Sequence, residues 1–209
     1  MKTHARPFRR ASLALAAFVL VSGGCATQVT RVSPEQQIDL SGRWNDADSR
    51  LVAEELIRLS FDTQQGGDWA VRHMQAHAGA RPTVIIGSVR NRSMEQIPVG
   101  TFVRDLEQAY LRSGQVAVVA SRDEREEVRE EKLDQQENAT ADTRARLARE
   151  RGADYMLQGD IQSIEDREGR RRVVYYQVDL VLVNVETNEK TWTGQHKIKK
   201  MVERPRFRI

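Results

Sequence analysis

Cysteine and aromatic residues are scarce in this chain of 209 residues, which has one cysteine and only 6% aromatic residues. A single cysteine cannot form a disulfide within the chain. Few aromatic side chains leave little surface on which nucleic-acid bases could stack. The length suits one soluble domain with short additions, and it excludes a barrel enzyme joined to a cofactor domain.

An excess of positive charge is also missing from the main part of the chain. The formal net charge is +3, but residues 1–24 contain four basic and no acidic side chains, which leaves 29 basic against 30 acidic residues in the remainder. A phosphate-binding protein keeps its lysine and arginine excess in the folded part. The composition therefore argues against nucleic acid as a partner.

The apolar run of residues 11–21 belongs to a leader, residues 1–24. It follows a basic stretch and precedes the small residues Ser22, Gly23 and Gly24, the pattern of a secretory signal peptide. Its 11 residues are about half of the roughly 20 that a membrane-spanning helix needs. We therefore expect a signal peptide here rather than a permanent transmembrane helix.

Cys25 directly follows the leader, where a bacterial lipoprotein signal peptidase leaves an acylated N-terminal cysteine. Several acyl chains, palmitate among them, would hold the protein firmly, because each buried methylene contributes about 0.8 kcal/mol. Ala26 favours the outer membrane under the enteric sorting rule. The alternative is an ordinary signal peptide that ends near a free thiol.

Residues 25–39 are polar and show neither a helical nor a strand period, which predicts a short tether. Fully stretched, this tether reaches at most about 50 Å. We expect the globular domain at residues 40–209, close to its membrane.

Apolar residues recur at helical spacing after Asn45, a residue type that commonly caps helices. The β-branched apolar runs at residues 83–89 and 116–119 predict strands buried on both faces. Residues 121–137 are mostly charged and predict a solvated helix packed by one edge. The other expected elements are helices at residues 69–77 and 140–152, a helix with its apolar stripe at residues 102–110 that Gly114 ends, and strands at residues 155–164, 173–185 and 190–199.

The order of these elements predicts the fold class. Strands first alternate with helices and then follow one another along the chain. We expect a single α/β domain with a mixed β-sheet of about five strands and helices packed against it. The last three strands form an antiparallel meander in this interpretation.

The chain offers little for catalysis or for a cofactor. His73 and His77 have the spacing of zinc ligands on a helix, but no third ligand accompanies them, and we interpret them as surface histidines. Ser88 lacks the second glycine of a nucleophile elbow. Glycine-rich phosphate-binding loops are missing as well. We expect no enzyme activity, no metal and no cofactor.

Arg90, Asn91 and Arg92 follow the first predicted strand, in a loop position where functional residues commonly lie. They are the candidate partner-binding residues. The alternative is a turn in which the Asn91 side chain satisfies its own backbone.

Several stretches stand in a characteristic order behind the leader: Ile38–Asp46 (IDLSGRWND), Ser88–Ser93 (SVRNRS), Gly152–Leu157 (GADYML), Leu180–Val183 (LVLV) and Trp192–Gly194 (WTG). Together they resemble the LpoB-type penicillin-binding protein activator family of outer-membrane lipoproteins. The likeness covers most of the chain, from Ile38 to Lys199.

The resemblance implies a fold similar to the N-terminal domain of TolB and a role without catalysis. Such a lipoprotein binds a bifunctional penicillin-binding protein in the periplasm and activates peptidoglycan synthesis. Family members usually reach the synthase on a long disordered arm, whereas the tether here is short. The alternative function is that of a lipoprotein subunit in an envelope assembly or secretion complex that uses the same fold.

Overall fold

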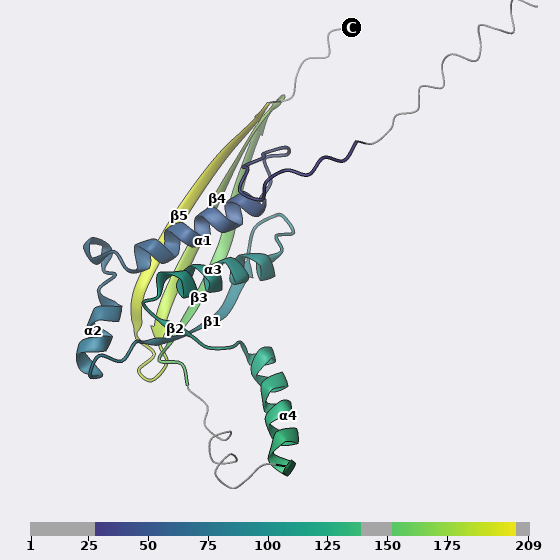
Figure 1. Cartoon of the computed structure of the whole chain (residues 1–209). Coiled ribbons are helices and arrows are strands. Elements are labelled where there is room, and N and C mark those ends of the chain that lie inside the picture. Colours follow the sequence, from purple (N-terminus) through teal and green to yellow (C-terminus); the bar gives the residue numbers. More distant parts are fainter. Residues whose placement is uncertain (1–27, 139–151, 204–209) are drawn as a thin grey trace, which may run out of the picture. The chain divides into compact units, whose positions relative to one another are not determined.

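A computed structural model of the chain describes residues 28–138 and 152–203 (Figure 1). The chain divides into two units, Met1–Gln36 and Gln37–Ile209. In the first unit the described residues form a turn, in which the Gln36 amide donates to the Ser33 carbonyl at 3.0 Å. Cys25 and the helix predicted from Thr140 lie outside the described residues.

The second unit is built on a five-stranded mixed sheet with the strand order β2-β1-β3-β4-β5. β1 pairs in parallel with β2 and β3, and β3, β4 and β5 pair antiparallel as a meander. The single mixed sheet predicted from the element order is confirmed. The elements are α1 (Asp46–Ser60), the 3-10 helix η1 (Thr63–Gln65), α2 (Trp69–Ala76), β1 (Thr83–Asn91), α3 (Val99–Ser113), β2 (Ala117–Val118), α4 (Arg122–Asn138), β3 (Tyr155–Glu168), β4 (Arg171–Asn184) and β5 (Lys190–Glu203).

Local sequence sets the ends of the two helices that cover the sheet. At the start of α1, the Asn45 side chain accepts from the Asp48 amide and the Asp48 carboxylate accepts from the Asn45 amide, both at 2.9 Å. This reciprocal capping satisfies two backbone donors that the helix leaves free. α3 ends at Gly114, whose φ of 65° is the left-handed conformation that glycine adopts without steric cost.

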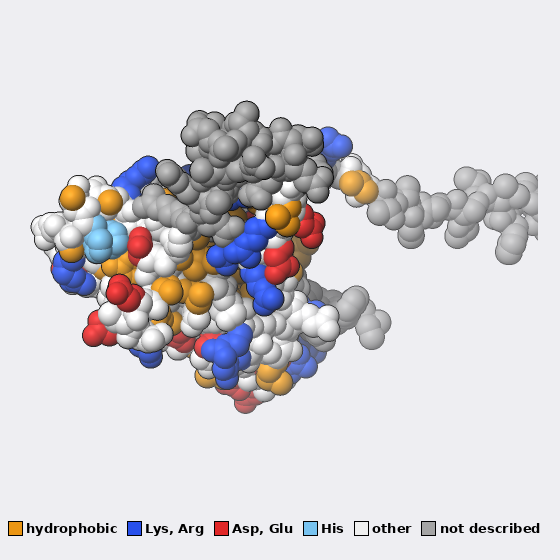
Figure 2. All heavy atoms as spheres, turned by 90° about the horizontal axis from the view of Figure 1, so that it is seen from below, with side chains coloured by type: hydrophobic (Ala, Val, Ile, Leu, Met, Phe, Trp, Pro, Cys, Tyr) orange, Lys and Arg blue, Asp and Glu red, His pale blue; other side chains and the backbone are white. Residues whose placement is uncertain are grey.

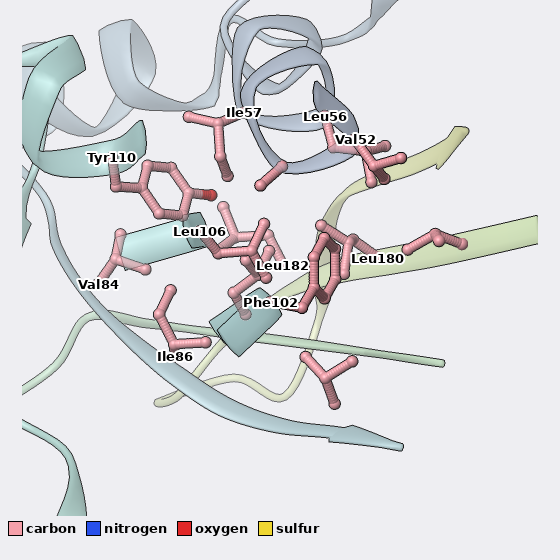
Figure 3. Packing of buried hydrophobic residues seen from close by; sticks show 14 of the residues in the cluster. Val52, Leu56, Ile57, Val84, Ile86, Phe102, Leu106, Tyr110, Leu180 and Leu182 are labelled. Atoms are coloured by element: carbon pink, nitrogen blue, oxygen red, sulfur yellow. The ribbon is translucent and has the colours of Figure 1, made fainter. Parts of the chain in front are cut away.

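The core lies between the sheet and the helices α1 and α3, which run side by side across one face (Figure 1). Every second residue of β4 from Val174 to Leu182 is buried there, as expected of strand alternation. Figure 3 shows how the apolar side chains of α1, α3, β1 and β4 point toward one another in this layer. The labelled residues are Val52, Leu56, Ile57, Val84, Ile86, Phe102, Leu106, Tyr110, Leu180 and Leu182.

The opposite side of the sheet, called the second face below, carries the alternate residues of β3, β4 and β5. On β4 these residues are half-buried and mostly polar or β-branched. They include Tyr175, Gln177, Asp179, Val181 and Val183. The described helices α1 and α3 pack on the other side of the sheet. The polar side chains of the strands therefore lie on the second face.

The predicted bounds of four strands, β2 to β5, need correction. β2 has only two residues and is half-buried, because it is the edge of the sheet and pairs with β1 alone. β3, β4 and β5 each have 14 residues, longer than predicted, because their charged ends keep the ladder pairing up to Glu168 and Arg171. These long strands reach past the end of α1 (Figure 1).

Candidate partner-binding site

The predicted partner-binding residues do not all lie in a loop. β1 continues through Arg90 and Asn91, which pair with Asp160 and Ile161 of β3, and only Arg92 follows the strand. The parallel pairing of β1 with β3 changes register between Ile86 and Val89 and then continues to Asn91. The loop prediction is therefore wrong for Arg90 and Asn91, and the strand holds both residues in a fixed register.

Two of the three predicted side chains converge on one carboxylate of the second face. Arg90 Nε donates to Asp160 Oδ1 at 3.1 Å, and Arg92 Nε donates to the same oxygen at 2.8 Å. The arginine side chains are 63% and 57% exposed, and that of Asp160 is 27% exposed. Exposed pairs of this kind contribute at most about 1 kcal/mol to stability, so they mainly fix the direction of the two guanidinium groups.

Asp160 lies directly opposite a second carboxylate, that of Asp179 on β4. Like charges in directly opposite positions destabilise an antiparallel pair of strands. Here the two charges have separate donors, since Gln177 Nε2 and Gln195 Nε2 each donate to Asp179 at 2.7 Å. The result is a polar row across four strands, in which the two acceptors on β3 and β4 lie between donors on β1 and β5.

Asn91 has a different role from its two neighbours. Its Oδ1 accepts from the Ser93 amide at 2.9 Å and its Nδ2 donates to the Glu95 carbonyl at 2.7 Å. For Asn91 alone, the alternative interpretation is confirmed: its side chain holds the turn that follows β1. Asn91 shapes the loop that follows β1, and Met94 in this loop is 87% exposed.

A shallow hollow of about 440 Å³ lies over the polar row. Polar side chains and backbone line most of it, which suits contact with a polar protein surface better than binding of an apolar small molecule. Its lining includes Arg90, Gln158, Asp160, Asp179, Lys190 and Gln195.

The family of the chain is shown by its sequence. Residues 48–198, which run from α1 to β5, match the family model described as "Peptidoglycan-synthase activator LpoB". The chain belongs to the LpoB family. No curated protein matches it significantly.

Solved structures similar to this LpoB-family chain have low sequence identity to it. The LpoB C-terminal domain from Salmonella enterica is 18% identical, with a TM-score of 0.37 over 73% of this chain and 99% of that one. The NMR structure of E. coli LpoB is 14% identical, with a TM-score of 0.39 over 98% and 90%. Lipoprotein GNA1162 from Neisseria meningitidis is 19% identical, with a TM-score of 0.36 over 57% and 83%.

The sequence analysis missed the acceptors of the candidate site, Asp160 and Asp179, and the glutamines that donate to Asp179. A signal for them exists, because polar residues alternate with apolar ones along both strands at Gln158, Asp160 and Gln162 and again at Gln177 and Asp179. That period places them on one face. Only the strand register shows that Asp160 and Asp179 are directly opposite.

The prediction that His73 and His77 are surface histidines is wrong for His73, which is 6% exposed. Its Nδ1 lies 3.2 Å from the Tyr155 hydroxyl, and the His77 ring stacks on it with centroids 4.0 Å apart. Burial raises the pKa of Tyr155, and the charge of Asp154 raises it further. α2 directs His73 toward Tyr155 at the start of β3, so His73 is buried there.

Within the described residues, no group of three or more His, Cys, Asp or Glu side chains could hold a metal ion. The helices of residues 28–138 and 152–203 are all too short or too polar to cross a membrane.

Proposed function

We propose that this LpoB-family chain is an outer-membrane lipoprotein that binds a bifunctional penicillin-binding protein in the periplasm and activates its peptidoglycan synthesis. The observation that carries the proposal is the match of residues 48–198 to the peptidoglycan-synthase activator family. An activator needs no catalytic group of its own. It acts by binding the active conformation of the synthase more tightly than the resting one.

Acylation of Cys25 would anchor the protein. The signal-like leader of residues 1–24, with small residues just before the cysteine, supports this step. A Cys25→Ser variant tests it: the parent protein should sediment with the outer membrane, and the variant should stay in the soluble periplasmic fraction. Equal membrane association of both proteins would contradict acylation at Cys25.

The contact with the synthase would form at the Arg90 and Arg92 end of β1. Asp160 holds both guanidinium groups by their Nε atoms, and their exposed tips are free to face carboxylate or carbonyl groups of a partner. Met94 adds an exposed apolar contact in the same loop. Arginine with a flexible apolar neighbour is typical of the centre of a protein interface.

The direct experiment measures glycan polymerisation by the purified bifunctional penicillin-binding protein of the same organism with and without this chain. We expect stimulation by the parent protein and a loss of at least about tenfold in affinity with Arg90→Glu/Arg92→Glu, since central interface arginines often contribute 2 kcal/mol or more. Arg112→Glu/Arg122→Glu is the matched control, because both arginines are exposed and lie on α3 and α4.

Two results would overturn the proposal. The first is an unchanged rate of synthesis together with no measurable complex. The second is stable co-purification with an outer-membrane assembly and no synthase, which would favour the alternative of a structural lipoprotein subunit. Equal stimulation by the charge-reversed variant and by the control would keep the function and exclude Arg90 and Arg92 as the contact.

A further inference from the structure

An arginine-lined hollow of about 570 Å³ lies at the end of the long strands, around the turn between β3 and β4. Its lining has five arginines and one carboxylate, that of Glu203. Leu40 and Ser41 border it from the segment with which the second unit begins. The arginines are Arg43, Arg167, Arg170, Arg171 and Arg172.

Three of these arginines are held by carboxylates. Arg172 and Arg167 bind Glu165 at 3.3 Å and 3.2 Å, and Arg171 binds Glu203 at 2.9 Å. Arg172 Nη2 also donates to the Ser41 carbonyl at 3.0 Å, which fastens the start of the unit to the sheet. These contacts make the hollow a fixed feature of the fold.

The other two arginines leave an excess of positive charge. Arg43 and Arg170 are exposed and form no ion pair with any carboxylate of the described residues. Leu40, on the rim, is 92% exposed, so an apolar side chain stands among the guanidinium groups.

The opposite end of the molecule has a different character. Figure 2 shows acidic and basic side chains interspersed there, with apolar groups between them. The arginine hollow is therefore a local feature of one end and not a property of the whole described surface.

We propose that the arginine hollow binds the phosphate groups of anionic phospholipids in the membrane surface. Guanidinium groups match phosphate oxygens in a two-pronged geometry, and Leu40 would enter the boundary between headgroups and acyl chains. The membrane, rather than a soluble phosphate, is the occupant because the unit begins here and at most about 50 Å of chain joins it to Cys25. This part of the argument rests on the proposed acylation.

Docking in this way would orient the domain. The 14-residue strands β3 to β5 would stand away from the membrane, with their far end up to about 45 Å further out. One end of the domain would then contact the membrane, and a short tether would be long enough to allow this. The second face would stay accessible to a partner.

Vesicle sedimentation tests the inference without the acyl chains. We would use the chain from residue 26, which keeps every core residue, with vesicles of phosphatidylcholine that do or do not contain about 30 mol% phosphatidylglycerol. We expect binding to the anionic vesicles only, and release in 1 M salt, where the screening length falls to about 3 Å. The Arg43→Gln/Arg170→Gln variant should bind at least about tenfold more weakly, since each basic residue near an anionic surface raises partitioning several-fold.

The control is Arg112→Gln/Arg122→Gln, which removes the same charge from α3 and α4. Equal weakening by both variants would overturn the inference, and so would binding to neutral vesicles with the same affinity. Binding of peptidoglycan fragments in place of vesicles would also overturn it. If Cys25 proves not to be acylated while the anionic vesicles still bind through Arg43 and Arg170, the anchor proposal fails and this inference stands.

Discussion

Lys200 Nζ lies 2.6 Å from Asp48 Oδ2, and the two side chains are only 9% and 4% exposed. The lysine near the end of β5 thereby supplies the counter-charge for a carboxylate at the start of α1. Asp39, in the segment before α1, lies 2.5 Å from the same ammonium group. The contact joins the beginning of the compact unit to its last strand.

Replacing Lys200 by Met should lower the free energy of unfolding by about 3 kcal/mol, because it leaves the Asp48 carboxylate buried without the counter-charge of Lys200. Urea denaturation measures the loss. Lys199→Met is the matched control, since Lys199 points to the second face and should change stability by less than about 0.5 kcal/mol. Equal losses of unfolding free energy in the two variants would show that the buried ion pair does not stabilise the protein.

The same cluster predicts how stability depends on pH. The hydrogen bond from Lys200 lowers the pKa of Asp39, so the unfolded chain binds more protons near pH 4 and stability falls on acidification through that range. Burial opposes the charge of Lys200, but its hydrogen bonds to Asp39 and Asp48 outweigh this and raise its pKa above 10.5. Its contribution is therefore complete below that value and declines at higher pH.

Urea midpoints measured across the acid range would show this slope in the parent protein. In Lys200→Met the slope near pH 4 should be smaller, because Asp39 no longer has the hydrogen bond that lowers its pKa. An identical slope in both proteins would mean that other carboxylates control the acid transition.

Gly194→Ala should destabilise the core by about 1–3 kcal/mol. A Cβ atom at this position would lie 2.2 Å from the Trp192 ring, which is 4% exposed and fills the space beside the glycine. Thermal unfolding followed by tryptophan fluorescence would report both the loss and the moved ring. Gly100→Ala, where a Cβ meets nothing within 4 Å, should be neutral or stabilising.

Glu124→Ala should loosen the first turn of α4 and cost about 1 kcal/mol of local stability. Glu124 accepts from the Ser121 amide at 2.8 Å, and its ion pair with Arg104 at 2.7 Å ties α4 to α3. The hydrogen bond from Arg104 lowers the pKa of Glu124 to about 2, so this tie should persist in acid where ordinary glutamates are protonated. Amide exchange in residues 122–126 tests the effect, with Glu126→Ala as the control.

Asp160→Asn should weaken synthase binding without loss of stability. The change removes the like charge opposite Asp179, but it also removes the negative charge that holds Arg90 and Arg92, so the remaining amide oxygen binds them more weakly. Asp179→Asn is the control, since it leaves both arginines on Asp160. Calorimetric titration of the two variants should separate them by several-fold in affinity, and equal affinities would argue against a role for the arginine positions.

The sequence predicted those helices and strands whose formation depends on neighbouring residues. Asn45 and the apolar residues after it identify α1, and alternation along residues 155–199 identifies the meander. The sequence did not predict that β1 continues through Asn91. The register shift between Ile86 and Val89 interrupts the regular pairing with β3, so the last residues of the strand show no regular strand pattern. His73 was misjudged because its burial depends on Tyr155, 82 residues away along the chain.

The candidate site was predicted only as far as its β1 residues. Arg90 and Arg92 come directly after the apolar run of residues 83–89, which the sequence shows. Their acceptor on β3 and the opposing carboxylate on β4 depend on two strand registers, and a register is fixed by turn geometry and core packing together. Such relations between distant residues have no local signature.

The buried contact between Asp48 and Lys200 spans 152 positions of the chain. During synthesis α1 is made first, yet its carboxylate can leave water at low cost only after the last strand has been added. A growing or truncated chain that ends before Lys200 therefore lacks the native arrangement of its first helix. The last strand must therefore be synthesised before the first helix can reach its native arrangement.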